Sequence, residues 1–305
     1  MRVFVTGATG WIGSAVVPEL VSAGHHVTGL ARSDASAAAL AAAGADALPG
    51  TLDDLGALRE AASAADGVIH LAFKHEEAFS GGFAAAAEAD RRAIETFGAA
   101  LANSGRPLII ASGLAGHRPG VVATENDAPD PGSAAGQRVR SEQTALSLAA
   151  SGVRSSSLRL PPTVHGQGDH GFLATLVAIA RDKGVSGSIG DGANHWPAVH
   201  RLDAARLFRL ALETAPARSV LHAVAEEGVP LRTIAEAIGQ HLDLPVTSIA
   251  PENAGEHFGW LAAFLAIDVR ASSQLTRQLL GWQPTHPDLI PDLDQGHYFR
   301  EPAVA

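Results

Sequence analysis

An apolar strand that runs directly into a glycine-spaced turn opens the chain. Residues Arg2–Thr6 read as a strand, Gly7, Gly10 and Gly13 follow at three-residue intervals, and a helical pattern begins at Ile12. Gly7 permits a tight turn, Gly10 lets the backbone approach a pyrophosphate, and Gly13 lets the helix pack against the sheet. The helix N-terminus offers free N–H groups and partial positive charge to that pyrophosphate. The turn therefore predicts a dinucleotide site.

Strand-like and helical segments alternate over the first half of the chain. The predicted strands are Arg2–Thr6, His26–Ala31, Val68–Ala72, Leu108–Ser112 and Ser156–Leu160. The predicted helices are Ile12–Ala23, Asp54–Ala65, Phe83–Asn103 and Gln137–Ala150, with an Ala-rich helix near Ala35–Ala43. Strands separated by helices imply βαβ units with right-handed crossovers. The pattern predicts an α/β, Rossmann-type, doubly wound parallel sheet.

The organisation changes after the Pro161-Pro162 pair, and Pro and Gly cluster again between residues 184 and 197. A helix over Asp203–Thr214, with Asp203 as N-cap, and a strand over Val220–Ala225 suggest a return to the main sheet. The rest of the chain reads as short helices with little strand. We expect a Rossmann domain of residues 1–165 plus about 199–226, and a smaller, mostly helical C-terminal lobe of about 166–198 plus 227–305.

Charge and composition exclude several classes of protein. The chain of 305 residues carries a formal net charge of −10 and has no cysteine. Nucleic acid and anionic membrane are therefore poor partners, and disulfides and Cys-based zinc sites are excluded. The apolar run at the N-terminus is too short for a secretory signal, and no run reaches the roughly 18 residues of a membrane span. We expect a cytoplasmic protein with a small-molecule substrate.

The spacing Gly-x-x-Gly-x-x-Gly resembles that of the extended short-chain dehydrogenases/reductases, within the epimerase/dehydratase-like superfamily. The resemblance continues through residues 66–72, 158–166 and 280–284. It implies a nicotinamide cofactor and a substrate site in the C-terminal lobe. It also suggests a homodimer through the helices Phe83–Asn103 and Gln137–Ala150, with a monomer as the alternative. It also implies these cofactor-binding residues: Gly7, Thr9, Gly10, Trp11, Ile12, Gly13, Thr51, Leu52, Leu71, Ala72, Phe73, Arg138, Pro161 and Thr163.

The residues after the second predicted strand bear on the choice of cofactor. A site for NAD usually places an acid there to bind the ribose 2′-hydroxyl. This chain has Arg32 and Ser33 instead, and both can bind a 2′-phosphate. The pair predicts NADP over NAD. The alternative is that Arg32 is an ordinary surface residue and Asp34 takes the acidic role.

The proton donor that the resemblance implies is missing. The family carries Tyr-x-x-x-Lys on the helix after the fifth strand, whereas this chain has one tyrosine, Tyr298, and lysines only at 74 and 183. The glutamate of Ser141-Glu142 has a common counterpart in the family. Aligning the two places Arg138 at the lysine position and Ala134 at the tyrosine position. A register shifted by two residues would put Arg140 there instead. Arg138 can place charge near a developing oxyanion but cannot donate a proton; the alternative is an exposed helix arginine.

Ser112 and His165 are the other candidate catalytic residues. Ser112 ends the predicted strand Leu108–Ser112, where a hydroxyl could bind substrate, or could simply cap a turn. His165 stands where many relatives have tyrosine, and an imidazole can donate a proton near neutral pH; a structural histidine is the alternative. We expect no metal site, because His165, Asp169 and His170 lack a recognised ligand spacing.

These features favour an NADP(H)-dependent reductase that transfers hydride to a small carbonyl, imine or enone. A cationic imine or activated enone would need less help from an acid. The alternatives are a non-catalytic NADP sensor and an epimerase or dehydratase that uses bound cofactor transiently. The lobe contributes aromatic residues that fit either an apolar ligand or a core: Phe172, Trp196, Phe258, Trp260 and Phe264.

Overall fold

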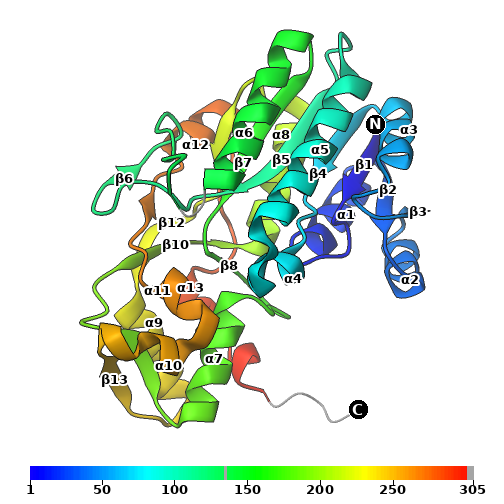
Figure 1. Ribbon diagram of the computed structural model, residues 1–305. Helices are drawn as coiled ribbons and strands as arrows, with labels where there is room; N and C mark the ends of the chain where they lie inside the picture. The colour runs from blue at the N-terminus through cyan, green and yellow to red at the C-terminus, as the bar shows by residue number, and fades with distance from the viewer. Residues whose placement is uncertain (134–135, 301–305) are drawn as a thin grey trace.

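A seven-stranded parallel sheet organises the computed structural model, which describes residues 1–133 and 136–300 (Figure 1). The strand order is β11-β7-β5-β4-β1-β2-β3. The bounds are β1 Arg2–Thr6, β2 His26–Ala31, β3 Asp46–Pro49, β4 Gly67–His70, β5 Pro107–Gly113, β7 Arg154–Leu160 and β11 Val220–His222. The order reverses between β1 and β4, so the carboxyl ends of these two strands form the topological switch point where ligands bind. The predicted doubly wound class is confirmed.

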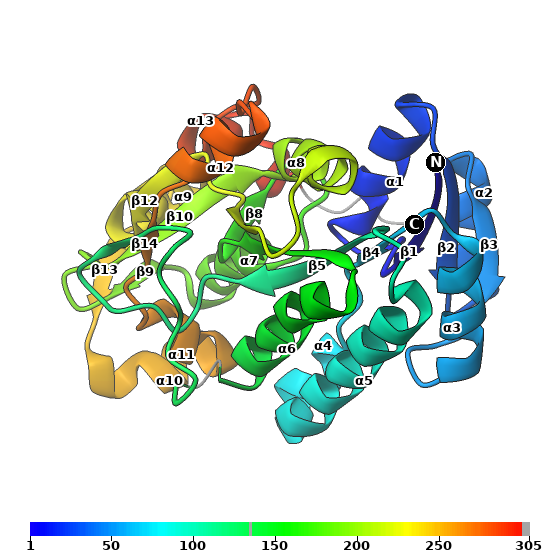
Figure 2. The same cartoon turned by 90° about the horizontal axis from the view of Figure 1, so that it is seen from above.

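Helices cover both faces of this sheet (Figure 2). The helices are α1 Gly13–Ser22, α2 Asp34–Ala42, α3 Leu55–Ala64, α5 Phe83–Leu101, α6 Gly136–Ser147 and α8 Arg201–Thr214. Successive residues of β1 point to opposite faces. Val3 and Val5 join a core with α1 and α8, and Phe4 joins a second core with α3 and α5. None of the helices in the described ranges is long and apolar enough to cross a membrane.

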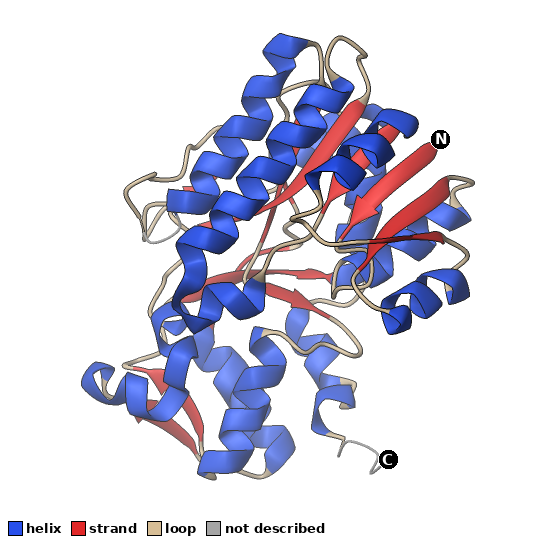
Figure 3. Ribbon diagram, turned by 45° about the vertical axis from the view of Figure 1, so that its right-hand side comes forward, coloured by secondary structure: helices blue, strands red, loops and turns tan. Residues whose placement is uncertain are grey.

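The C-terminal lobe contains helices and short strands (Figure 3). Its helices are α7 Phe172–Lys183, α9 Leu231–Leu242, α10 Ala254–Phe258, α11 Ala262–Leu265 and α13 Leu289–Asp294. Between it and the main sheet runs a three-stranded sheet of β8 Thr163–His165, β10 His195–His200 and β12 Glu226–Pro230. The expectation of short helices with little strand after residue 226 agrees with the structure, where the strands are short: β12, β13 (Val246–Ile249) and β14 (Arg270–Ala271).

Smaller elements complete the chain. They are α4 His75–Glu77, the π-helical turn η1 Ala78–Gly82, β6 Val122–Ala123, the 3₁₀ turn η2 Leu148–Ser151, β9 Ser186–Ile189, η3 Pro251–Asn253, η4 Gly259–Leu261, β14 Arg270–Ala271, α12 Gln274–Leu280 and η5 His297–Phe299. Trp282, just after α12, is fully buried in the core that also holds β1. Part of the segment assigned to the lobe thus packs on the Rossmann sheet.

Three sequence-based boundaries need correction. The fourth strand ends at His70 rather than Ala72, because the Ala72 amide donates to Thr6 Oγ1 (3.3 Å) instead of extending the ladder. The strand predicted to reach Ala225 ends at His222. Asp203 does not cap α8, whose N-cap is His200. Asp203 is buried one turn inside, where its carboxylate accepts from the amides of Thr285 and His286 (both 3.0 Å).

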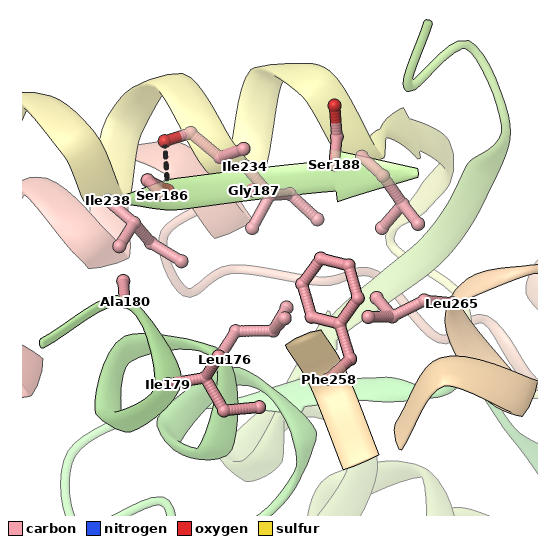
Figure 4. Close-up of a pocket in the computed structure, with 12 residues that line it drawn as sticks. Leu176, Ile179, Ala180, Ser186, Gly187, Ser188, Ile234, Ile238, Phe258 and Leu265 are labelled. Atoms are coloured by element: carbon pink, nitrogen blue, oxygen red, sulfur yellow. Dashed lines mark hydrogen bonds between the residues drawn. The ribbon is translucent and has the colours of Figure 1, made fainter. Parts of the chain in front are cut away.

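The core of the lobe is closed. Figure 4 shows a cavity between α7, α9 and β9, lined by apolar side chains that include Leu176, Ile238 and Phe258. Its volume is about 10 Å³, which is barely the space of one water molecule. This cavity therefore has no room for a substrate.

Candidate active site

The glycine loop after β1 has a shape that side chains would destroy. Gly7 has φ +66°, and a Cβ there would lie 2.7 Å from the Ala72 amide nitrogen. A Cβ on Gly13 would lie 2.0 Å from the Gly7 carbonyl oxygen. The sequence had suggested that Gly13 lets α1 pack against the sheet. In the structure, the start of α1 packs on the loop itself, at Gly7 and Ala8. Both glycines hold the loop tight against the carboxyl end of β4.

Three amide groups at the start of α1 point outward from this loop. The Gly10 amide donates to the Gly7 carbonyl (3.0 Å), which closes the turn. In the described part of the chain, the amides of Trp11, Ile12 and Gly13 have no hydrogen-bond partner. Free amides at a helix N-terminus bind phosphate groups. The loop therefore fits the pyrophosphate of a dinucleotide.

The residues predicted beside the adenosine half lie along the ends of β2 and β3. Arg32 is exposed directly after β2. Ser33 caps α2 and accepts from the Ser36 amide (3.2 Å). Thr51 donates from its amide and its hydroxyl to Asp54 Oδ2 (2.7 and 3.0 Å), and Leu52 is buried. The side chain of Arg32 is thus an exposed positive charge at this end of the site, and the alternative residue, Asp34, is exposed beside it.

Arg138 projects from α6 toward the carboxyl edge of the sheet. Its Nη1 lies 2.8 Å from Asp90 Oδ1, and its Nη2 donates to the Ala111 carbonyl (2.7 Å). Its guanidinium lies 4.4 Å from the centre of the Phe73 ring. Arg140, the alternative in the sequence alignment, is exposed. Ala134, aligned with the family tyrosine, lies outside the described residues.

A buried hydrogen-bonded chain joins this arginine to the glycine loop. Thr6 Oγ1 lies 2.6 Å from His70 Nδ1, and His70 Nε2 lies 3.2 Å from Asp90 Oδ1. Because Thr6 also accepts from the Ala72 amide, its hydroxyl proton is free for Nδ1, which leaves the His70 proton on Nε2 facing Asp90. We call the chain Thr6–His70–Asp90–Arg138 the buried relay. It ties β1, β4, α5 and α6 together.

Burial and charge oppose each other at Asp90. Burial alone raises the pKa of this carboxyl, but the charge of Arg138 and the hydrogen bond from His70 outweigh it and lower the pKa to about 2. Asp90 therefore stays ionised and fixes the guanidinium. Neither His70 nor Asp90 was expected from the sequence as a site residue. Two features could have indicated them: a histidine in an apolar strand, and an aspartate on the apolar face of the helix Phe83–Leu101.

Ser112 lies at the end of β5, as predicted, and is buried. Nearby, Glu142 of α6 accepts hydrogen bonds from Arg159 Nη2 (2.6 Å) and from the Ser157 hydroxyl (2.8 Å). Burial raises the pKa of Glu142, but the ion pair with Arg159 and the hydrogen bond from Ser157 together lower it below its ordinary value. This arrangement holds α6 against β5 and β7, and so sets the position of Arg138.

His165 and Tyr298 lie on the lobe side of the glycine loop, in buried pairs. His165 is fully buried, with Nδ1 2.9 Å from Asp292 Oδ2. The Tyr298 hydroxyl donates to Asp169 Oδ2 (2.9 Å) and accepts from the Gly166 amide (3.1 Å). Burial and the neighbouring Asp169 raise the pKa of Tyr298 far above its ordinary value. The only tyrosine of the chain is therefore a poor proton donor.

The turn between β7 and β8 contacts the glycine loop through Trp11. The indole Nε1 donates to the Val164 carbonyl (2.8 Å), and the Arg201 guanidinium lies 4.3 Å from the centre of the Trp11 ring. Pro161 and Thr163, both predicted beside the cofactor, are buried in this turn. Thr163 Oγ1 has no hydrogen-bond partner among the described residues. An unpartnered hydroxyl here suits a site that a ligand completes.

Comparison with known proteins agrees with this geometry. The model of the NAD dependent epimerase/dehydratase family matches residues 3–222. The chain belongs to this family. Within it, an uncharacterized protein of Schizosaccharomyces pombe is 50% identical over 301 residues, covering 98% of this chain and 100% of the relative. The 3-diazoavenalumate denitrifying reductase of a Streptomyces species is 32% identical, covering 94% of this chain and 97% of the relative.

The solved structures similar to this epimerase/dehydratase-family chain share its fold. The dTDP-glucose 4,6-dehydratase DesIV of Streptomyces venezuelae, solved with NAD bound, superposes with a TM-score of 0.78 at 20% identity. The match covers 97% of this chain and 96% of that one. Similarity at this identity shows the fold alone. Family membership and the shared fold confirm the epimerase/dehydratase-like resemblance.

Proposed function

We propose that this protein is an NADP(H)-dependent reductase of electrophilic small molecules. One observation carries the proposal: Arg138 is fixed beside the switch point by Asp90, while the only tyrosine is bonded to Asp169 in the lobe. The site thus has a fixed cation and a phosphate-binding loop at one sheet edge. It has no tyrosine that could serve as the proton donor.

Bound NADPH would supply the hydride at such a site. The amides of Trp11, Ile12 and Gly13 would hold its pyrophosphate, and Arg32 would bind the 2′-phosphate, which favours NADPH over NADH. Phe73 and the guanidinium of Arg138 would lie at the reacting end. With a carbonyl or enone, the role of Arg138 would be to stabilise the negative charge that hydride addition places on the oxygen.

The substrate class follows from what the site can supply. Reduction of a ketone consumes a hydride and a proton, whereas an iminium carbon accepts a hydride and becomes a neutral amine without a proton. An activated enone takes up the hydride and can then obtain its proton from water. Imines and enones are therefore the proposed substrates. The name of the Streptomyces relative, a reductase acting on a diazo compound, supports a reductase over an epimerase.

The test is oxidation of NADPH by the purified protein, followed by its absorbance, against matched ketones, enones and cyclic iminium salts. We expect oxidation with iminium salts and enones, at least about tenfold faster than with the ketones. Binding of NADPH without oxidation by any member of the panel would support a sensor and overturn the reductase. Equal rates with ketones would overturn the proposed substrate class.

A further inference from the structure

Aromatic rings lead from Arg138 to the lobe in an unbroken series of contacts. Phe73, under the Arg138 guanidinium, has its ring centre 5.1 Å from that of His75. His75 lies 5.7 Å from Phe79, and Phe79 stacks on Trp260 at 5.0 Å with 23° between the planes. These residues come from the segment after β4 and from η4 of the lobe.

The lobe side of this series holds more rings. Trp260 contacts Phe172 (5.6 Å), and Phe264 contacts both Phe172 (4.9 Å) and Phe79 (5.9 Å). The two rings at the centre are unusually open to water. Phe79 is 44% exposed and Trp260 is 48% exposed. Large apolar side chains that stay exposed next to one another mark a binding surface more often than a core.

The backbone kinks beside Phe79. Phe79 lies in the segment Ala78–Gly82, between α4 and α5. Gly81 in this segment leaves helical geometry with φ +100°. The kink presents Phe79 to Trp260.

We propose that Phe79, Trp260 and Phe264 form a binding site for a planar aromatic substrate, with its electrophilic carbon toward Arg138. This inference rests on the proposed reductase function. An electrophilic conjugated ring is poor in electrons, so it stacks favourably on the electron-rich face of an indole. The ring series runs from Trp260 through Phe79 and His75 to Phe73 under Arg138, and this direction sets the proposed orientation of the ligand.

Two other cavities are poor candidates for the substrate site. The cavity in the lobe core holds about 10 Å³. The other hollow, about 490 Å³, is lined by Arg218, Ser219 and Val220 at the amino end of β11. In a parallel sheet that end lies opposite the carboxyl edge where the cofactor site is built.

The experiment is calorimetric titration of the NADP⁺-loaded protein with two unreactive amides, cinnamamide and cyclohexylacrylamide. They differ only in a flat against a puckered ring. We expect cinnamamide to bind at least about tenfold more tightly. Trp260→Leu and Phe79→Leu should each weaken cinnamamide binding by about three- to tenfold, the range of one aromatic contact, and leave cyclohexylacrylamide unchanged.

The control is Leu279→Ala, which alters another exposed apolar residue, 49% exposed, on α12; neither affinity should change. Equal affinities of the two amides, or cinnamamide binding that survives both ring variants, would overturn the aromatic site. These outcomes are separable from those of the proposed function. If NADPH is oxidised but cinnamamide binding is unchanged in both ring variants, the reductase stands and the aromatic site is refuted. If cinnamamide binding depends on the rings but no substrate oxidises NADPH, the aromatic site stands and the reductase is refuted.

Discussion

Arg138 and Asp90 form an ion pair with 2.8 Å between Nη1 and Oδ1, the aspartate buried and the arginine partly open. The pair joins α6 to α5 at the carboxyl edge of the sheet. His70 fixes the aspartate from behind, and the Ala111 carbonyl and the Phe73 ring also contact the guanidinium, so its position is well defined. This geometry resembles that of a positioned electrostatic catalyst rather than that of a surface arginine.

Replacing Arg138 should reduce activity. We predict that Arg138→Met lowers kcat/KM for NADPH-dependent reduction by about 10²-fold, because a fixed cation is lost from the site of developing charge. Arg140→Met is the matched control, since Arg140 lies on the same helix and is exposed. Steady-state kinetics of both variants decide the matter. A large loss with Arg140→Met, or none with Arg138→Met, would show that the helix register is misassigned.

The glycine loop and the fold were predictable from the sequence because both depend on local pattern. The spacing of Gly7, Gly10 and Gly13 predicts a turn, and β1 and β2 have the predicted bounds. Arg138 was found by aligning one helix. Its partners could not be found that way, because Asp90 and His70 are 48 and 68 residues before it and come together only through the crossovers of the sheet.

The C-terminal lobe was harder to predict, because its contacts also join residues that are far apart in the sequence. Trp260 and Phe264 were recognised as aromatic residues, but sequence could not distinguish a core from a ligand surface. That distinction depends on Phe79, which comes from the other half of the chain and stacks on Trp260. The sequence showed only that Tyr298 is not part of a Tyr-x-x-x-Lys pair. Its hydrogen bond to Asp169 could not be predicted, because the two residues are 129 positions apart.

The Asp90 carboxyl should link stability to acid pH. Its pKa falls from 3.8 to about 2 on folding, so its contribution, about 2 kcal/mol, is fully present above about pH 4 and is lost as the pH falls toward 2. We predict that wild type exceeds Asp90→Asn in free energy of unfolding by about this amount near pH 6, and that the gap closes between about pH 4 and pH 2. Urea titrations of both proteins across this range test it. A gap that stays constant down to pH 2 would contradict the assignment.

The tight glycine loop should tolerate no methyl group. We predict that Gly13→Ala weakens NADPH binding at least about tenfold, because the new Cβ would lie 2.0 Å from the Gly7 carbonyl and must displace the loop. Gly56→Ala is the control, since a Cβ there meets nothing within 4 Å. Fluorescence titration with NADPH measures both. Equal affinities would mean that the loop does not hold the cofactor.

Arg32 should select the cofactor. We predict that Arg32→Ala raises the KM for NADPH by about tenfold or more and leaves that for NADH unchanged, because only NADPH carries the 2′-phosphate. Arg59→Ala, at an exposed position of α3, should change neither. If both cofactors weaken equally with Arg32→Ala, the preference for NADP is refuted.

The most direct test of the account follows deuterium from NADPH labelled at C4 of the nicotinamide. Wild type and Tyr298→Phe should both transfer the label to the electrophilic carbon of an iminium or enone substrate, with rates within about threefold, because Tyr298 is not the acid. With the enone, Arg138→Met should transfer it about 10²-fold more slowly, because hydride addition places negative charge on the enone oxygen. Mass spectrometry of the products gives the answer. Transfer abolished in Tyr298→Phe while the protein stays folded, or no label in any wild-type product, would contradict it.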